Sequence, residues 1–348
     1  MNQMIREAIK KVVEGHDLTE SEAVAAMQEI MDGEATPSQI ASFITALRIK
    51  GETVDEVTGF ARVMREKSVK IPTTREPIAL IDTCGTGGDR LNTFNISTAS
   101  AFVVAGAGLA VAKHGNRAMS SKCGSADVLE ALGVNIGLSP EQVGRCVDEV
   151  GIGFMFAPAH HPSMKHAVGL RKEIGIRTVF NILGPLTNPA GAKRQLIGVF
   201  DAYLTELMAG VLKRLGSDRA IVAHGLDGLD EISTLGRTRI TELQDGELKT
   251  YEISPEDVGL KTAQPKDLAG GEDSAESARI LEEVLNGKQG PARDVVLLNA
   301  GAALKVAGKA DSFQEGIALA AASIDGGKAR AVLKGFCKLS QDLIREME

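Results

Sequence analysis

Glycines and polar side chains gather in three short stretches, each directly after an apolar run. The first, DTCGTGGDRLNTFNIST over 82–98, contains Gly85, Gly87 and Gly88. Glycines let backbone N–H groups approach an anion, and a helix beginning near 95–98 would turn its positive end toward the same anion. The stretch lacks the third glycine of the dinucleotide fingerprint, since Arg90 stands there, and it lacks the Gly-Lys-Ser/Thr of a P-loop. The residues alone leave two interpretations of this stretch: a phosphate-binding loop and a plain glycine-rich turn.

The second stretch, KHGNRAMSSKCGSADVLEALG over 113–133, combines cations, hydroxyls and glycines. Lysine and arginine bind phosphate oxygens through charge-assisted hydrogen bonds, so these residue types suit a phosphorylated ligand. A solvated polar loop is the alternative. The polar candidates are Lys113, His114, Asn116, Arg117, Ser120, Ser121, Lys122 and Ser125.

The third stretch, LDGLDEIS over 226–233, brings Asp227, Asp230 and Glu231 close together. Mg²⁺ commonly lies between a few carboxylates and substrate phosphates, whereas an exposed acidic turn is the alternative. The three stretches together predict a glycine loop for an anion, a basic loop and a Mg²⁺ site around one cleft. No Ser-His-Asp or Cys-His pattern stands out, so no residue is assigned as nucleophile or as general acid or base.

Alternating strands and helices must position these stretches. Strands are predicted at 78–82, 109–113, 152–156, 195–201 and 219–225, and helices at 96–108, 125–133, 139–150, 161–175 and 203–216. This alternation predicts an α/β fold with a mostly parallel sheet flanked by helices, in which ligands lie at the carboxyl ends of the strands. The residues at 238–253 predict a hairpin that turns at Asp245-Gly246, and helices dominate from Ser274 onward.

The first 70 residues predict helices only. Capping boxes pair Thr19 with Glu22, Thr36 with Gln39, and Thr53 with Glu56. We therefore expect a small all-helical domain at 1–72, joined by helices near 163–190, and a larger α/β domain at 73–348 that holds the ligand and the metal.

The composition restricts the class of protein. The chain has 348 residues, 43% of them apolar, which suits one large or two modest domains. A net charge of −7 argues against bulk binding to nucleic acid or to an anionic membrane. No apolar run reaches the length of a membrane span, and the N-terminus is not a signal sequence. Four cysteines without a C-x-x-C pair suit a reducing compartment, so we expect a cytoplasmic protein.

Five motifs resemble those of the anthranilate phosphoribosyltransferase family of tryptophan biosynthesis. They are DTCGTGGD, NTFNIST, KHGNRAMSSKCGSADVLEALG, NILGPLTNPA and GLDEIS, and the resemblance covers essentially the whole chain. It implies a small helical domain hinged to a larger α/β domain, with the active site in the cleft between them, as in nucleoside phosphorylases and phosphoribosyltransferases of this fold. It also implies a homodimer.

The resemblance implies a reaction as well. The family transfers the phosphoribosyl group of 5-phosphoribosyl 1-pyrophosphate (PRPP) to the amine of anthranilate, and it releases pyrophosphate.

The same resemblance implies site residues. Those expected to bind PRPP are Gly85, Gly88, Asp89, Thr93, Asn95, Ile96, Ser97, Thr98, Lys113, His114, Gly115, Asn116, Arg117, Ala118, Met119, Ser120, Ser121 and Ser125. Those expected to bind anthranilate are Gly85, Asn116 and Arg171. Two Mg²⁺ ions per subunit are expected, one held by Ser97 with Glu231 and the other by Asp230 with Glu231.

Other interpretations remain open from the sequence. A class II pyrimidine nucleoside phosphorylase shares the architecture but does not need the acidic metal pair. A nucleic-acid-binding relative without transferase activity would carry a basic face. Arg171, taken alone, could be a surface residue of its helix paired with Glu173.

Overall fold

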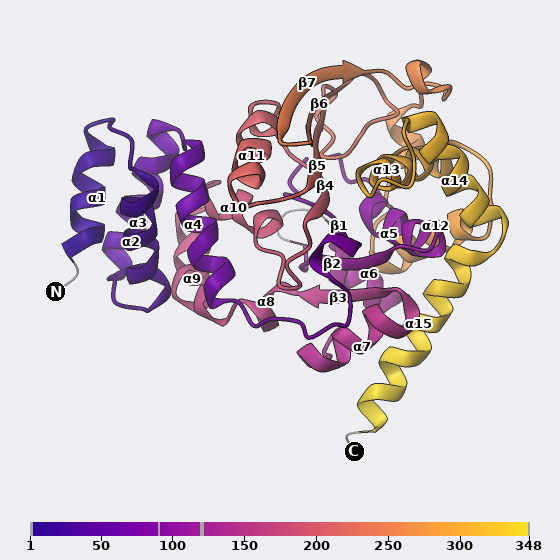
Figure 1. Ribbon diagram of the computed structural model, residues 1–348, viewed down its shortest axis with the longest axis horizontal. Helices are drawn as coiled ribbons and strands as arrows, with labels where there is room; N and C mark the ends of the chain where they lie inside the picture. The colour runs from indigo at the N-terminus through magenta and orange to yellow at the C-terminus, as the bar shows by residue number, and fades with distance from the viewer. Residues whose placement is uncertain (1–2, 90, 119–121, 347–348) are drawn as a thin grey trace.

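The computed structural model describes residues 3–89, 91–118 and 122–346 (Figure 1). The chain begins with a helical unit made of α1 (Gln3–Val13), α2 (Glu20–Met31), α3 (Pro37–Lys50) and α4 (Val54–Lys67). All three predicted capping boxes are present, at Thr19, Thr36 and Thr53. In each box the cap hydroxyl accepts a backbone N–H of the first turn, while a first-turn side chain accepts the N–H of the cap residue, which fixes where the helix begins.

A seven-stranded sheet forms the centre of the rest of the described chain (Figure 1). Its strands are β1 (Leu80–Gly85), β2 (Ala110–Gly115), β3 (Ile152–Phe156), β4 (Arg194–Gly198), β5 (Arg219–Gly225), β6 (Thr238–Gln244) and β7 (Glu247–Ile253). The order is β3-β2-β1-β4-β5-β6-β7, with β6 and β7 antiparallel and the others parallel. The order reverses between β1 and β4, which is where ligands bind in sheets of this kind.

Helices cover both faces of the sheet, as predicted. They are α5 (Ile96–Gly106), α6 (Ser125–Ala131), α7 (Pro140–Val150), α8 (Ala157–His160), α9 (Lys165–Ile174), α10 (Phe180–Leu183), α11 (Tyr203–Arg214), α12 (Ser274–Leu285), α13 (Pro291–Val306), α14 (Phe313–Asp325) and α15 (Lys328–Arg345). On one face α5 packs between the strands and α13, α14 and α15 (Figure 1). On the other face α11 packs against β5 and meets α4 of the helical unit.

The predicted helix at 161–175 divides into shorter pieces. A 3₁₀ turn at Pro162–Met164 separates α8 from α9, and His161 has φ −124° and ψ 64°. A residue before proline avoids the helical region, because the proline ring collides with its backbone. The predicted strand at 195–201 also ends early, at Gly198.

The predicted hairpin is present as β6 and β7. Asp245 and Gly246 both have positive φ, 53° and 75°. These values suit a two-residue turn between twisted strands, for which Asp-Gly is a favoured pair.

The helical unit and the sheet share an apolar core. One apolar cluster includes Phe43 and Phe60 of the N-terminal helices, Ala167 of α9, Phe180 of α10 and Val222 of β5. Helix α9 also packs against α2 and α3. The division of the chain at residues 72 and 73 stays a prediction, because the core does not stop there. Within the described ranges, no helix combines the length and the apolar character that crossing a membrane requires.

Candidate active site

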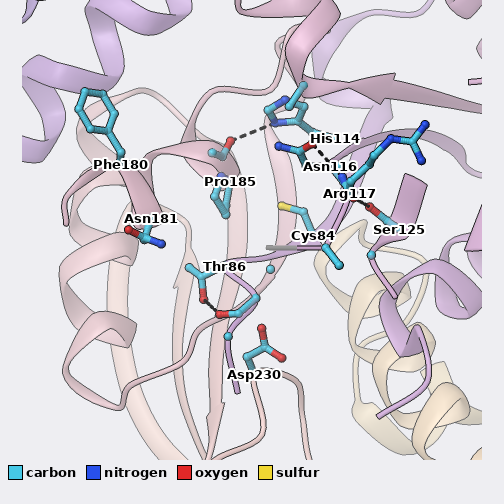
Figure 2. Close-up of a pocket in the computed structure, with 18 of the residues that line it drawn as sticks. Cys84, Thr86, His114, Asn116, Arg117, Ser125, Phe180, Asn181, Pro185 and Asp230 are labelled. Atoms are coloured by element: carbon cyan, nitrogen blue, oxygen red, sulfur yellow. Dashed lines mark hydrogen bonds between the residues drawn. The ribbon is translucent and has the colours of Figure 1, made fainter. Parts of the chain in front are cut away.

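A cavity of about 1540 Å³ opens at the carboxyl edge of the parallel strands. Its wall combines the three stretches with α9, with α10 and with Arg48 and Met64 of the N-terminal helices. In Figure 2, Phe180 lies on one side of this space, Asn116 lies across it, and Asp230 lies at the bottom. Residues that are far apart in the sequence therefore face one cavity.

The glycine loop that follows β1 is tied to the end of β4. The Thr86 N–H donates to the Gly198 carbonyl oxygen (2.9 Å), and the Thr86 hydroxyl accepts the Phe200 N–H (3.1 Å). Gly88 has φ +90°, a conformation that side chains rarely adopt. The N–H groups of Gly88 and Asp89 make no hydrogen bond with any residue that the structure describes. These N–H groups are therefore available to an anion.

The acidic loop lies directly on the end of β4. A Cβ atom at Gly198 would overlap the backbone carbonyl of Asp230, so only glycine allows this approach. The pKa of Asp230 is raised to about 7, mainly by burial and next by repulsion from Asp89. Burial, followed by repulsion from Asp230, raises the pKa of Glu231 to about 8. Three carboxyl groups are thus crowded into a half-buried corner that favours a bound cation.

A buried lysine partly balances this corner. The Lys113 ammonium donates to the carbonyl of Thr83 and to the hydroxyl of Ser97 (3.3 Å). Burial lowers the pKa of Lys113, while the negative charges of Asp82 and Glu231 raise it. Glu231 accepts the backbone N–H of Ser97 (3.1 Å), at the first turn of α5. One network therefore joins the acidic loop, the basic loop and the start of α5.

The residues present fit a magnesium site. Asp230, Glu231 and the Ser97 hydroxyl offer the hard oxygen ligands that Mg²⁺ prefers, and Asp89 Oδ2 is buried with no hydrogen-bond partner in the described chain. No three His, Cys, Asp or Glu side chains of the described residues make a metal centre by themselves. Water or substrate oxygen atoms would complete the coordination of a bound Mg²⁺.

The NILGPLTNPA motif supports strands β1 and β2 near the cavity. The Asn188 amide donates to Asp82 (2.8 Å) and to the carbonyl of Ala112 (2.9 Å), and Asp82 in turn accepts the His114 N–H (3.1 Å). The His114 Nδ1 lies 3.0 Å from the carbonyl oxygen of Gly184 (Figure 2). A carbonyl only accepts, so Nδ1 carries the proton and Nε2 is left as an acceptor.

The segment at 268–277 supports the glycine loop from outside. The Phe94 N–H donates to the carbonyl of Leu268 (3.1 Å). The Ser277 hydroxyl donates to Asn95 Oδ1 (2.9 Å), and the Asn95 amide donates to the carbonyl of Cys123 (3.3 Å). Asn95 thus joins the start of α5, the loop after β2 and the beginning of α12.

Known proteins were compared with this chain. The family model "Glycosyl transferase family, a/b domain" matches residues 78–330, and "Glycosyl transferase family, helical bundle domain" matches residues 6–68. An anthranilate phosphoribosyltransferase of Moorella thermoacetica is 60% identical over 96% of this chain and 97% of its own length. The enzyme of Acetivibrio thermocellus is 57% identical over 98% of both chains.

Solved structures agree with these relatives. The anthranilate phosphoribosyltransferase of Thermus thermophilus is 44% identical, with a TM-score of 0.90 over 96% of this chain and 99% of that one. The Saccharomyces cerevisiae enzyme in complex with PRPP and Mg is 28% identical, with a TM-score of 0.87 over 97% and 98%.

The chain belongs to the anthranilate phosphoribosyltransferase family. Most of the residues that the family resemblance marks for PRPP or Mg²⁺ line the cavity. These are Gly85, Gly88, Asp89, Thr93, Asn95, Ile96, Ser97, Lys113, His114, Gly115, Asn116, Arg117, Ala118, Ser125, Asp230 and Glu231. Their roles in binding stay predictions. Met119, Ser120 and Ser121 lie outside the described residues.

Two of the family residues are placed differently from the others. The Arg117 guanidinium pairs with Asp127 (2.9 Å) and Glu130 (2.5 Å) of α6. Thr98 is buried and does not line the cavity, and its hydroxyl has no hydrogen-bond partner among the described residues.

Arg171 lies on the cavity wall. Its guanidinium carbon is 5.7 Å from the centroid of the Phe180 ring. It forms no ion pair with Glu173 or with any other carboxylate in the described part of the chain. The alternative of a paired surface arginine is therefore not what the structure shows, and a positive charge is free to meet an anionic ligand.

Sequence reasoning did not single out several residues that shape the site. Arg177 lines the cavity, while Gly198, Asn188 and Ser277 hold its loops in place. Asn188 lies inside the NILGPLTNPA motif, so that motif offered a signal. Ser277 and Arg177 lie in ordinary polar contexts and offered none.

The acidic corner predicts how the stability of the metal-free protein varies with pH. A carboxyl whose pKa is raised on folding contributes stability at low pH, and this stability is lost as the pH rises toward the folded pKa. Burial lowers the pKa of His114 from 6.5 to about 3, so this residue acts in the opposite direction below pH 6.5. We therefore expect Tm in EDTA to fall as the pH rises from 6.5 to the pKa of Glu231, which is about 8.

Thermal unfolding over this pH range measures the effect. The variant that combines Asp230→Asn with Glu231→Gln removes both groups, so its Tm should change less across the same range. Parallel curves for the two proteins would contradict the assignment of the pH dependence to this pair.

Proposed function

We propose that the protein transfers the phosphoribosyl group of PRPP to the amine of anthranilate, giving N-(5-phosphoribosyl)anthranilate and pyrophosphate, in tryptophan biosynthesis. One observation carries the proposal: free backbone N–H groups, crowded carboxyl groups and the unpaired Arg171 face one cavity at the switch point of the sheet. This arrangement suits one substrate with phosphates and one with a carboxylate. Membership of the anthranilate phosphoribosyltransferase family supports the same pair of substrates.

The pyrophosphate of PRPP is proposed to lie on the glycine loop. Breaking the bond between C1′ and oxygen leaves a sugar with oxocarbenium character, and the electron pair departs with pyrophosphate. The free N–H groups of Gly88 and Asp89, with the N-terminal end of α5, stabilise this growing negative charge without having to reorganise.

Two Mg²⁺ ions are proposed at the acidic corner. Ser97 and Glu231 would hold one ion, and Asp230 with Glu231 would hold the other. Bound Mg²⁺ would neutralise the negative charge that grows on the pyrophosphate oxygens. The raised pKa values of Asp230 and Glu231 support this site, because a cation returns both groups to their charged form.

Anthranilate is proposed to bind between Arg171 and His114. A guanidinium binds a carboxylate through two hydrogen bonds, which would orient the neighbouring amine toward C1′. Gly85 and Asn116 would contact the ring or the amine. Burial keeps His114 neutral, and its Nε2 is buried without a partner among the described residues. Nε2 would accept an N–H of the attacking amine and would take up the proton that this nitrogen loses once its bond to C1′ forms.

The protein is further proposed to act as a cytoplasmic homodimer with a helical domain at 1–72 and an α/β domain at 73–348. Exposed apolar side chains support self-association: Val13 on α1 and Ile49 on α3 are 67% and 82% exposed. Helices α1 and α3 contact each other. These side chains offer an apolar surface to a second copy of the chain.

One assay tests the proposal. With PRPP and Mg²⁺, the protein is expected to consume anthranilate, seen as a loss of anthranilate fluorescence that stops when EDTA is added. Thymidine with phosphate is the matched control for the nucleoside phosphorylase alternative. Release of thymine together with unchanged anthranilate fluorescence would reject the transferase function.

A further inference from the structure

Arg177 lies on the wall of the cavity. It follows α9, which carries Arg171, and it precedes α10. Its guanidinium carbon lies 4.2 Å from the centroid of the Phe200 ring, and its Nη2 donates to the carbonyl of Gly88. It forms no ion pair with any carboxylate that the structure describes. The Arg177 guanidinium therefore donates to a backbone carbonyl and not to a carboxylate.

The direction of that carbonyl decides what the glycine loop presents to the cavity. In a trans peptide the C=O and the following N–H point in opposite directions. Holding the Gly88 oxygen at Arg177 therefore turns the N–H of Asp89 away from Arg177, and this N–H has no acceptor among the described residues. A carbonyl oxygen that pointed at a phosphate would repel it, whereas a free N–H attracts it.

Other contacts fix Arg177 in this position. The Asn181 side chain accepts the Thr178 N–H (3.0 Å), which holds the chain directly after Arg177. Phe200, on which the guanidinium lies, donates its N–H to the hydroxyl of Thr86 in the same loop. A Cβ at Gly88 would come within 3.1 Å of Nη2, so the contact also uses the absence of a side chain there.

We propose that Arg177 is a positioning residue for the pyrophosphate-binding loop: by holding the Gly88 carbonyl it keeps the Asp89 N–H directed at the pyrophosphate of PRPP. This inference rests on the proposed function. It assigns Arg177 a role in binding the phosphorylated substrate, although Arg177 follows the helix that carries the residue proposed for anthranilate.

Kinetics of three variants test the inference. Arg177→Ala is expected to raise the KM for PRPP about tenfold, the effect of losing one charge-assisted hydrogen bond, with the KM for anthranilate within about twofold of wild type. Arg177→Gln keeps an N–H donor without the charge, so it should recover part of the PRPP affinity. Phe200→Leu removes the ring beneath the guanidinium, and its effect should be less than additive with Arg177→Ala.

Binding and stability measurements separate the explanations. Calorimetric titration of Arg177→Ala with pyrophosphate in the presence of Mg²⁺ should show the same loss of affinity as the KM for PRPP. The control variant Arg345→Ala removes the same charge from an exposed position and should bind pyrophosphate like wild type. If Arg177→Ala unfolds at a much lower Tm, the Gln variant carries the test. Unchanged pyrophosphate affinity in Arg177→Ala and Arg177→Gln would overturn the inference. It would also be overturned if Arg177→Gln bound pyrophosphate as weakly as Arg177→Ala while Arg177→Lys kept full activity. An inactive wild-type protein would instead reject the proposed function.

Discussion

Changing Asp230→Asn together with Glu231→Gln is expected to lower kcat/KM by at least about 100-fold, the scale seen when one preorganised electrostatic contact to a transition state is lost. Both side chains keep their size, but two negative charges leave the corner that would hold Mg²⁺. Pyrophosphate gains charge as the bond to C1′ breaks, so the ions matter more in the transition state than in the ground state. The apparent affinity for Mg²⁺, measured by titrating the rate, should fall as well.

The fold of this variant should survive. Asp230 and Glu231 repel each other and Asp89, and neutral amides remove that repulsion. Asp245→Asn with Glu247→Gln in the β6–β7 hairpin removes the same charge far from the cavity and should leave the rate near wild type. Full activity and an unchanged Mg²⁺ titration in the Asp230–Glu231 variant would reject the metal site.

Arg171→Ala is expected to raise the KM for anthranilate about ten- to a hundredfold, with a much smaller change in the KM for PRPP. A charge-assisted hydrogen bond contributes roughly 1.5–3 kcal/mol, which corresponds to this range. The guanidinium has no carboxylate partner among the described residues, so its removal leaves no unpaired acid in the protein. Steady-state kinetics with each substrate varied in turn measure the two constants.

Two further variants sharpen this test. Arg171→Lys keeps the charge but loses the two-pronged geometry, so its KM for anthranilate should lie between those of wild type and Arg171→Ala. Arg279→Ala on α12 removes an exposed arginine that is paired with Glu283, and it should have no effect. An anthranilate KM near the wild-type value in Arg171→Ala would place the carboxylate elsewhere.

Much of the fold could be predicted from local signals in the sequence. The capping boxes at Thr19, Thr36 and Thr53 and the turn at Asp245-Gly246 depend on residues within a few positions of each other, and each is present. The apolar runs of the five parallel strands report burial on both faces, so these strands were predicted, although β1 lies at 80–85 and not at 78–82, and β4 ends at Gly198. The division of the helix at Pro162 was missed, although proline gives a local signal for it.

The contacts that shape the cavity could not be predicted in this way. Arg177 meets Gly88 across 89 positions, and Asn188 meets Asp82 across 106. Gly198 is needed because the backbone of Asp230 lies against it. No residue near Gly198 in the sequence predicts that contact. Such requirements arise only when the strands have been placed side by side.

The separation of Asn95 and Ser277 along the sequence also has a consequence for synthesis on the ribosome. These two residues are 182 positions apart, and their side chains hydrogen-bond beside the glycine loop. At about 5–20 residues per second, translation of that interval takes roughly 9–36 s. During this time the emerging chain carries the whole glycine motif without the partner that holds it. PRPP therefore meets a completed site only late in translation, and a chain arrested before Ser277 keeps the motif but lacks this support.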